Sequence, residues 1–247
     1  MSEVIEQLLK QQQIWQAKSP PLRLSFSANN IATGFKPLDS QLHHGGWPRS
    51  AMIDLLYDQF GIGEWQLALP ALLKLSQQAK LLVVIAPPYM PYAPAIEQAG
   101  LSSEQVLWVQ AQTLAESLWA SEHILKTNCS FAVMVFLQKQ RLSQAQLRRL
   151  QLASSVHEGL FFVQRSGLFT SQSSPARLRL NLHAKQRKLH IHILKQPGGW
   201  SGQKVIINRP EDWLSPTSTL VTQTHAKPAS PSVAPNTAPK AEPPLLL

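Results

Sequence analysis

The residues with the clearest chemical content form a glycine-rich turn, Gly61-Ile62-Gly63-Glu64-Trp65, which follows an apolar run at residues 51–57. Backbone N–H groups of such a turn can cup phosphate oxygens. Phosphate transfer also needs a Lys for the β/γ oxygens and a Ser or Thr hydroxyl for Mg²⁺. Glu64 and Trp65 stand in those places instead; a carboxylate repels polyphosphate, and an indole cannot ligate magnesium. The sequence therefore predicts a degenerate nucleotide loop at Gly61, Gly63, Glu64 and Trp65, with no catalytic residue and no cofactor.

A second chemical feature is a one-sided block of positive charge. Of the chain's 23 Lys/Arg, 12 lie in residues 141–209 against a single carboxylate, Glu158, whereas the remaining segments are slightly acidic. Such a block attracts polyanions, and nucleic acid is the obvious one. A solubilising surface is the alternative interpretation. The candidate contacts to a DNA backbone are Arg141, Arg148, Arg149, Arg165, Arg177, Arg179, Lys185, Arg187 and Lys188.

A third feature is a proline-rich segment directly after a predicted strand. Residues 87–94 contain four prolines with two tyrosines and a methionine between them. Loops at the carboxyl end of a strand surround the ligand crevice of open α/β sheets. Rigid proline with exposed aromatic side chains suits protein binding, because little entropy is lost on docking. A lid packed over the nucleotide pocket is the equal alternative. The candidate protein-binding residues are Pro87, Pro88, Tyr89, Met90 and Tyr92.

The elements that position these residues alternate along the chain. Short apolar runs at residues 52–57, 81–86, 106–109, 131–137 and 160–164 alternate with helix-like segments at 65–78, 93–99, 113–126 and 143–157. Strands too apolar for simple alternation, each separated by a helix, predict a mostly parallel sheet with helices on both faces. Residues 177–183 and 188–194 alternate strictly, which predicts an antiparallel extension with one wet face, and 205–207 adds a third strand.

The predicted domain organisation has three parts. Residues 1–30 form an N-terminal helix and linker, because apolar residues recur there near helical spacing. Residues 31–210 form the α/β core. Residues 211–247 form a disordered tail rich in Pro, Ser, Thr and Ala, a composition that cannot bury enough apolar surface to fold.

Composition also limits the location and the chemistry. There is one cysteine, no basic leader and no apolar stretch of about 18 residues, so we expect a cytoplasmic, nucleoid-associated protein without a membrane span. His190 and His192 share a strand face, but no third ligand lies near them. His43 and His44 lie in a predicted loop. We expect surface residues at both pairs and no metal site.

The order of strand, loop and helix, with its lead-in segment, resembles the ATPase core of the RecA recombinase family over about residues 30–210. The lead-in residues are Thr33-Gly34, Leu38-Asp39, Leu42 and Gly45-Gly46-Trp47-Pro48. Four further motifs resemble the ImuA family, bacterial accessory proteins of SOS-induced, error-prone translesion DNA synthesis. They are Gly45-Gly46-Trp47-Pro48-Arg49, Gly61-Ile62-Gly63-Glu64, the segment from Ala86 to Pro94, and Leu150-Gln151-Leu152-Ala153.

The resemblance implies a RecA-like fold that has lost its ATPase parts. Leu137 stands where the recombinases orient magnesium with an acidic residue, and Pro87-Pro88-Tyr89 stand where they place the glutamate that activates water. We therefore expect no ATP hydrolysis, because phosphoryl transfer depends on positioning and charge neutralisation. The two DNA-contacting loops of the recombinases correspond to residues 138–141 and 166–176. Phe169, in the second loop, could stack on a base, although local packing is favoured.

The implied role is that of an adaptor. Its partners would be the Y-family polymerase-like protein ImuB, an error-prone C-family polymerase alpha subunit, single-stranded DNA and a RecA filament; self-association as in recombinases stays open. Two alternatives are kept. A divergent RecA-like ATPase would need a cation such as Lys195 to reach the pocket, although a surface role for Lys195 is favoured. A SulA-like inhibitor of cell division would have a degraded form of the same core, but SulA lacks the lead-in segment of residues 38–48.

Overall fold

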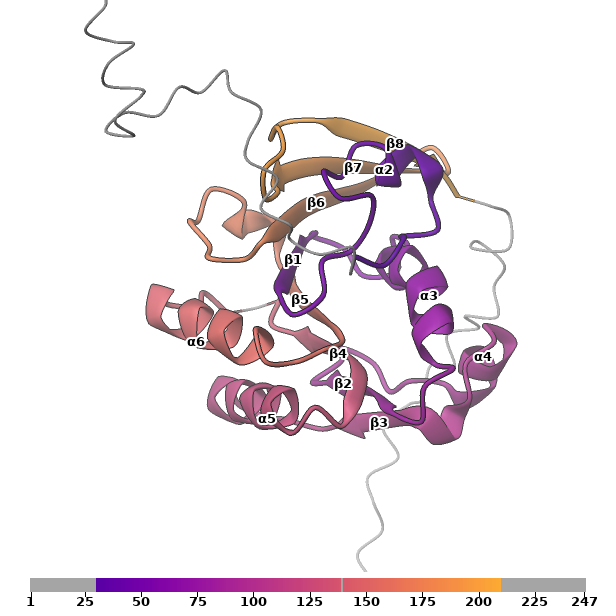
Figure 1. The fold of residues 1–247 in the computed structure, drawn as a ribbon, viewed down its shortest axis with the longest axis vertical. Coiled ribbons are helices and arrows are strands. Elements are labelled where there is room, and N and C mark those ends of the chain that lie inside the picture. The colour runs from indigo at the N-terminus through magenta and orange to yellow at the C-terminus, as the bar shows by residue number, and fades with distance from the viewer. Residues whose placement is uncertain (1–29, 139, 210–247) are drawn as a thin grey trace, which may run out of the picture. The chain divides into compact units, whose positions relative to one another are not determined.

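The computed structural model describes residues 30–138 and 140–209, which form one eight-stranded sheet in the order β3-β2-β4-β5-β1-β6-β7-β8 (Figure 1). The first six strands of this order run parallel, and β7 and β8 continue it antiparallel. The predicted fold class is confirmed. The strands are β1 (Met52–Leu56), β2 (Leu81–Ile85), β3 (Val106–Val109), β4 (Ser130–Phe136), β5 (Leu160–Arg165), β6 (Leu178–Lys185), β7 (Lys188–Lys195) and β8 (Lys204–Asn208).

Helices cover the two faces of the sheet as separate layers, which Figure 1 shows on either side of β4 and β2. One layer holds α2 (Lys36–Asp39), α3 (Glu64–Leu75) and α4 (Ala93–Gln98), whose apolar residues share a core with Ile53 and Leu55 of β1. The other holds α5 (Leu114–Thr127) and α6 (Gln144–Ser154), which pack on Met52 and neighbouring strands. Two short 3₁₀ turns, η1 (Ser103–Gln105) and η2 (Gly167–Phe169), complete the elements.

Local sequence accounts for where the second layer of helices begins. The Thr113 hydroxyl accepts a hydrogen bond from Glu116 N, and the Glu116 carboxylate accepts one from Thr113 N. Helix α5 therefore starts with a capping box. Ser143 and Gln146 make the same exchange at the start of α6. The local sequence therefore determines the residue at which each of these helices begins.

The lead-in segment, residues 31–48, is held in place by hydrogen bonds and a buried aromatic contact rather than by pairing as a strand of the sheet. Thr33 N donates to the Asp39 carboxylate at 2.8 Å, and Ile31 and Trp47 exchange backbone hydrogen bonds. The Trp47 indole is fully buried and meets the Phe162 ring edge-on, with centroids 5.3 Å apart. The Trp47–Phe162 contact fixes the segment against β5.

The sheet topology brings the glycine-rich loop and the proline-rich segment to the same end of the parallel strands. The loop after β1 and the proline-rich segment after β2 both leave from the carboxyl ends of parallel strands. Ligand crevices of open α/β sheets lie at this edge. The predicted N-terminal helix within 1–30 and the tail of 211–247 lie outside the described residues. No helix in the described ranges is long and apolar enough to cross a membrane.

Gly34 is a position where the chain tolerates only glycine. Its φ is +89°, and a Cβ there would lie 2.5 Å from Pro70 Cβ in α3. We predict that Gly34→Ala lowers the free energy of unfolding by about 1–3 kcal/mol, through backbone strain and the clash.

Gly45→Ala is the matched control for this substitution, because Gly45 also has positive φ (+66°) but open space around its Cβ position. Urea unfolding of both variants separates the two costs, and we expect the smaller loss at Gly45. Equal losses would show that the contact with Pro70 contributes nothing.

Candidate functional site

The turn between β1 and α3 keeps the shape of a phosphate cradle, but its own side chain fills it. Gly63 has φ +107° and precedes Glu64, the first residue of α3. The Glu64 carboxylate is buried and accepts hydrogen bonds from Gly61 N through Oε1 (3.0 Å) and from Gly63 N through Oε2 (3.1 Å). Backbone N–H groups of this kind are what a nucleotide loop offers to phosphate oxygens. Glu64 therefore acts as a built-in anion, beyond merely repelling an incoming one.

An uncharged network lies beside this loop, where a working site would hold metal and catalytic carboxylates. Tyr57, immediately after β1, is buried and donates its phenolic hydrogen to Gln164 Oε1 on β5. Burial, and after it the charge of Glu64, raise the pKa of Tyr57, so the phenol stays protonated. Gln138 lies beside it, and Leu137 is buried at the end of β4. Among these residues only Glu64 carries a charge.

Aromatic rings link the loop to the proline-rich segment. The rings of Tyr57 and Phe60 meet edge-on with centroids 6.0 Å apart, and those of Phe60 and Tyr89 do so at 6.2 Å. Tyr89 therefore leans on the loop after β1, as a lid would. Yet Tyr89 and Met90 remain 69% exposed and Tyr92 63% exposed, so most of this apolar area faces solvent. We call Phe60, Tyr89, Met90 and Tyr92 the aromatic surface.

A groove of about 280 Å³ adjoins the aromatic surface between the carboxyl ends of β2 and β3. Pro87, Pro88, Tyr89 and Met90 form one part of its lining, and Trp108 of β3 lies in another. The indole N–H of Trp108 is buried and has no hydrogen-bond acceptor among residues 30–138 and 140–209. Gln110 and Gln112 also line this groove, so it offers amide groups as well as apolar surface to a side chain or short segment of a partner.

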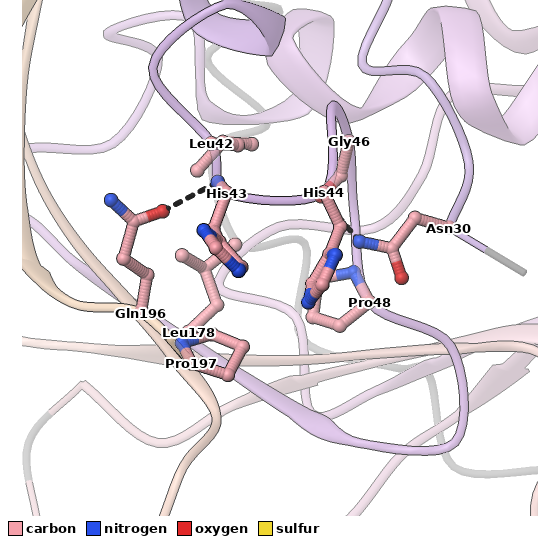
Figure 2. Close-up of a pocket in the computed structure, with 9 residues that line it drawn as sticks. All are labelled: Asn30, Leu42, His43, His44, Gly46, Pro48, Leu178, Gln196 and Pro197. Carbon is pink, nitrogen blue, oxygen red and sulfur yellow. Dashed lines mark hydrogen bonds between the residues drawn. The ribbon is translucent and has the colours of Figure 1, made fainter. Parts of the chain in front are cut away.

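A second hollow, lined by His43 and His44 of the lead-in segment and by Pro197 after β7, is too small for a ligand (Figure 2). It holds about 10 Å³, room for roughly one water. Figure 2 shows His43 N donating to Gln196 Oε1, at 2.9 Å. Burial, with the neighbouring charges of His43 and Arg177, lowers the pKa of His44. The hydrogen bond from His43 to Gln196 joins the lead-in segment to the residue that follows β7.

Two of the nine predicted DNA-contacting cations point into the protein. Arg165 of β5 and Arg179 of β6 flank Asp54 of β1, with Arg165 Nη1 at 3.3 Å and Arg179 Nε at 3.0 Å from Asp54 Oδ2. Asp54 and Arg165 are fully buried and Arg179 nearly so. Burial lowers the pKa of Arg165, and the Asp54 charge opposes that shift. These two arginines belong to an internal ion cluster, which corrects their assignment to a DNA-binding surface.

The same cluster holds down the loop predicted as the second DNA contact. Arg179 Nη2 donates to Phe169 O (3.2 Å), and the Arg165 guanidinium donates to Gln172 and lies 5.1 Å from the centre of the Phe169 ring. Lys195 Nζ donates to Ser174 O at 3.0 Å, and burial lowers the pKa of Lys195. Phe169 therefore packs locally, as favoured from the sequence, and Lys195 contacts this loop.

The other cations form two separate exposed groups. Arg141, Arg148 and Arg149 lie at or before α6, and Arg149 pairs with Glu122 of α5 at 3.0 Å. Lys185, Arg187 and Lys188 lie on the hairpin between β6 and β7. Arg177 is half-buried where β6 begins. No group of three His, Cys, Asp or Glu in the described ranges could hold a metal.

Sequence reasoning missed Asp54, the residue that organises the two buried arginines. A signal was present, because Asp54 is the one charged residue in the apolar run of residues 51–57. A carboxylate on a buried strand requires a cation or hydrogen-bond donors beside it. That requirement could have identified an internal partner for part of the basic block.

We predict that Glu64→Ala opens the loop to phosphate, because it frees the N–H groups of Gly61 and Gly63. The test is the melting temperature at increasing concentrations of inorganic pyrophosphate. The melting temperature of the variant should rise by about 2–4 °C for each kcal/mol of binding, and that of the wild type should not change. Glu104→Ala, which removes an exposed carboxylate from η1, is the charge-matched control. Stabilisation of the wild type by pyrophosphate would contradict the closed cradle.

We predict that Asp54→Asn lowers the free energy of unfolding by about 3–5 kcal/mol, because it leaves two buried guanidinium groups without their counter-charge. The control is Glu122→Gln, which breaks the pair between half-buried Glu122 and exposed Arg149 and should cost less than about 1 kcal/mol. Urea unfolding measures both variants. Similar midpoints would mean that the cluster does not stabilise the fold.

Comparison with known proteins identifies the fold. No protein-family model and no curated protein matches the sequence. Among solved structures, the crystal structure of the RadB recombinase superimposes with a TM-score of 0.57 at 17% identity, over 73% of this chain and 96% of that one. SulA from Pseudomonas aeruginosa aligns at 28% identity over 49% of this chain and all of that one, with a TM-score of 0.40. The chain therefore has a RecA-like fold.

Proposed function

We propose that this chain is a non-catalytic accessory factor of SOS-induced, error-prone translesion DNA synthesis. It acts as an adaptor that binds polymerase partners and brings them to DNA or to a RecA filament. The observation that carries the proposal is the Glu64 carboxylate bound to Gly61 N and Gly63 N. A nucleotide loop that is folded around its own carboxylate keeps the scaffold and has no use for a nucleotide.

The surroundings of that loop support the same conclusion. Phosphoryl transfer needs cations and metal ligands around the phosphates. Leu137, Gln138 and Tyr57 are uncharged, and the segment after β2 offers Pro87 and Pro88. A RecA-like core in which these positions carry no charge serves as a rigid support for binding surfaces.

The aromatic surface and its groove support a protein-binding role. Exposed Tyr and Met are enriched in the centres of protein interfaces, and contiguous apolar surface on a folded domain marks interaction sites. The resemblance to ImuA supplies the identity of the partners: ImuB and the alpha subunit of an error-prone C-family polymerase. We assign ImuB to the aromatic surface, because Tyr89, Met90 and Tyr92 are exposed there and the adjoining groove adds the amide groups of Gln110 and Gln112.

The exposed cations support a role at DNA. Five of the candidate residues, Arg141, Arg148, Lys185, Arg187 and Lys188, face solvent in a region with almost no carboxylates. Clustered cations suffice for contact with phosphates, and such contact is independent of sequence and sensitive to salt. DNA binding by this route needs no ATP.

We predict that Tyr89→Ser with Tyr92→Ser weakens binding of purified ImuB by about 30-fold or more, the loss expected when central aromatic anchors are removed. Isothermal titration with the full chain measures the change. Trp119→Ser is the control, because Trp119 is equally exposed but lies on α5. An unchanged affinity in the double variant would remove ImuB from this surface.

Two other outcomes would replace the proposed function. ATP hydrolysis that is abolished by Lys195→Ala would establish a divergent ATPase. Direct binding to the division protein FtsZ, with no binding to ImuB, would establish an inhibitor of cell division.

A further inference from the structure

The strongest unassigned surface is the solvent face of the antiparallel strands β6, β7 and β8. On it lie His183 and Lys185 of β6, Lys188, His190 and His192 of β7, and Lys204 of β8. The opposite face of the same strands is buried in the core, so this set is on the outer side. We call it the basic sheet face.

The strand register arranges these side chains as three rows across three strands. Lys185, Lys188 and Asn208 form the row nearest the hairpin turn. His183, His190 and Ile206 form the second row, and Asn181, His192 and Lys204 form the third. Directly paired residues of neighbouring strands stand about 5 Å apart, so the rows adjoin one another. Asn181 is buried, and the other eight side chains make up the surface.

The basic sheet face carries no carboxylate. Residues 159–209 contain no Asp or Glu. The carboxylate of β1, Asp54, is buried between Arg165 and Arg179. Lys185 and Lys188 are direct cross-strand partners, and like charges in this position repel. An external anion between them would relieve that repulsion.

The hairpin turn gives a second, independent observation. Gln186 and Arg187 form its two central positions with φ of +48° and +57°. A two-residue turn of this type favours Asn-Gly, because side chains are strained at positive φ. The sequence Lys185-Gln186-Arg187-Lys188 instead keeps long polar and cationic side chains at the tip. Strain retained at an exposed tip points to a role for the side chains themselves.

The contrast with the loop of residues 166–176 shows why this face matters. Around that loop the cations Arg165, Arg179 and Lys195 are used internally, because they bind Asp54, Phe169 O and Ser174 O. The lysines of the basic sheet face are exposed. The hairpin strands therefore keep charge that is available to a polyanion, as does the group at α6.

We propose that the basic sheet face is a binding surface for single-stranded nucleic acid, an inference that rests on the proposed function and assigns its DNA contact. Lys185, Lys188 and Lys204 contact phosphates. His183, His190 and Ile206, which is 50% exposed, form an imidazole and apolar row between them on which unpaired bases stack. A duplex hides its base faces, so the middle row favours a single strand.

The test is fluorescence anisotropy of a labelled oligothymidylate of about 30 nucleotides, titrated with the full chain over a series of salt concentrations. The variant Lys185→Gln/Lys188→Gln/Lys204→Gln removes three cations from the face. The matched control Lys36→Gln/Lys74→Gln/Lys126→Gln removes three exposed cations from α2, α3 and α5, with the same change in net charge. A rival variant, Arg141→Gln/Arg148→Gln/Arg149→Gln, tests the group at α6.

We expect the face variant to weaken binding about tenfold or more at low salt. The slope of log affinity against log salt should shrink by about 2, because each lost phosphate contact on a single strand contributes about 0.7. The control should change neither quantity to this extent. His190→Ala with Ile206→Ser should weaken binding while leaving the salt slope unchanged, because stacking releases no counterions.

Other outcomes overturn the inference in distinguishable ways. Equal losses in the face and control variants would show a general charge effect, and losses confined to the rival variant would move the contact to α6; the proposed function survives either result. If the face variant keeps its affinity for oligothymidylate but no longer binds phosphatidylserine vesicles, the basic sheet face is a membrane-binding surface instead. Failure of the wild type to bind the oligonucleotide at low salt would overturn both the inference and the DNA part of the proposed function.

Discussion

The buried ion cluster of Asp54, Arg165 and Arg179 is the constraint on which the rest of this molecule depends. Its members come from β1, β5 and β6, three neighbouring strands at the centre of the sheet. A buried carboxylate is tolerated only with compensating charge, and the two arginines in turn need acceptors beyond that one carboxylate. Those acceptors are Phe169 O and Gln172, so the cluster also fixes the loop that follows β5.

This arrangement determines how the basic block is divided. Cations that are adjacent in the sequence separate into an internal group, which organises the loop after β5, and an exposed group on α6 and the β6–β7 hairpin. The protein thereby keeps a recombinase-like scaffold while its loop becomes a fixed structural part. The lysines of the β6–β7 hairpin remain exposed.

The nucleotide loop shows the same principle on a smaller scale. Its amides still require an acceptor, because buried N–H groups are costly to leave unpaired. Glu64 supplies that acceptor from within the chain, so the turn remains ordered without a phosphate. The aromatic contact from Phe60 to Tyr89 then joins two loops that a nucleotide would otherwise hold together.

The sequence by itself determined the fold class, the strand and helix order and the degenerate character of the loop. These follow from local periodicity and from Glu64 in the place of Lys, both of which are readable over short distances. It did not reveal that Glu64 binds the loop amides, or that Arg165 and Arg179 turn inward while Lys185 and Lys188 face solvent. Those outcomes depend on which strands become neighbours: Asp54 meets Arg179 across 125 positions of sequence. Only tertiary structure decides such pairings, because the burial that forces a charge to find its partner is created by the packing of the whole sheet.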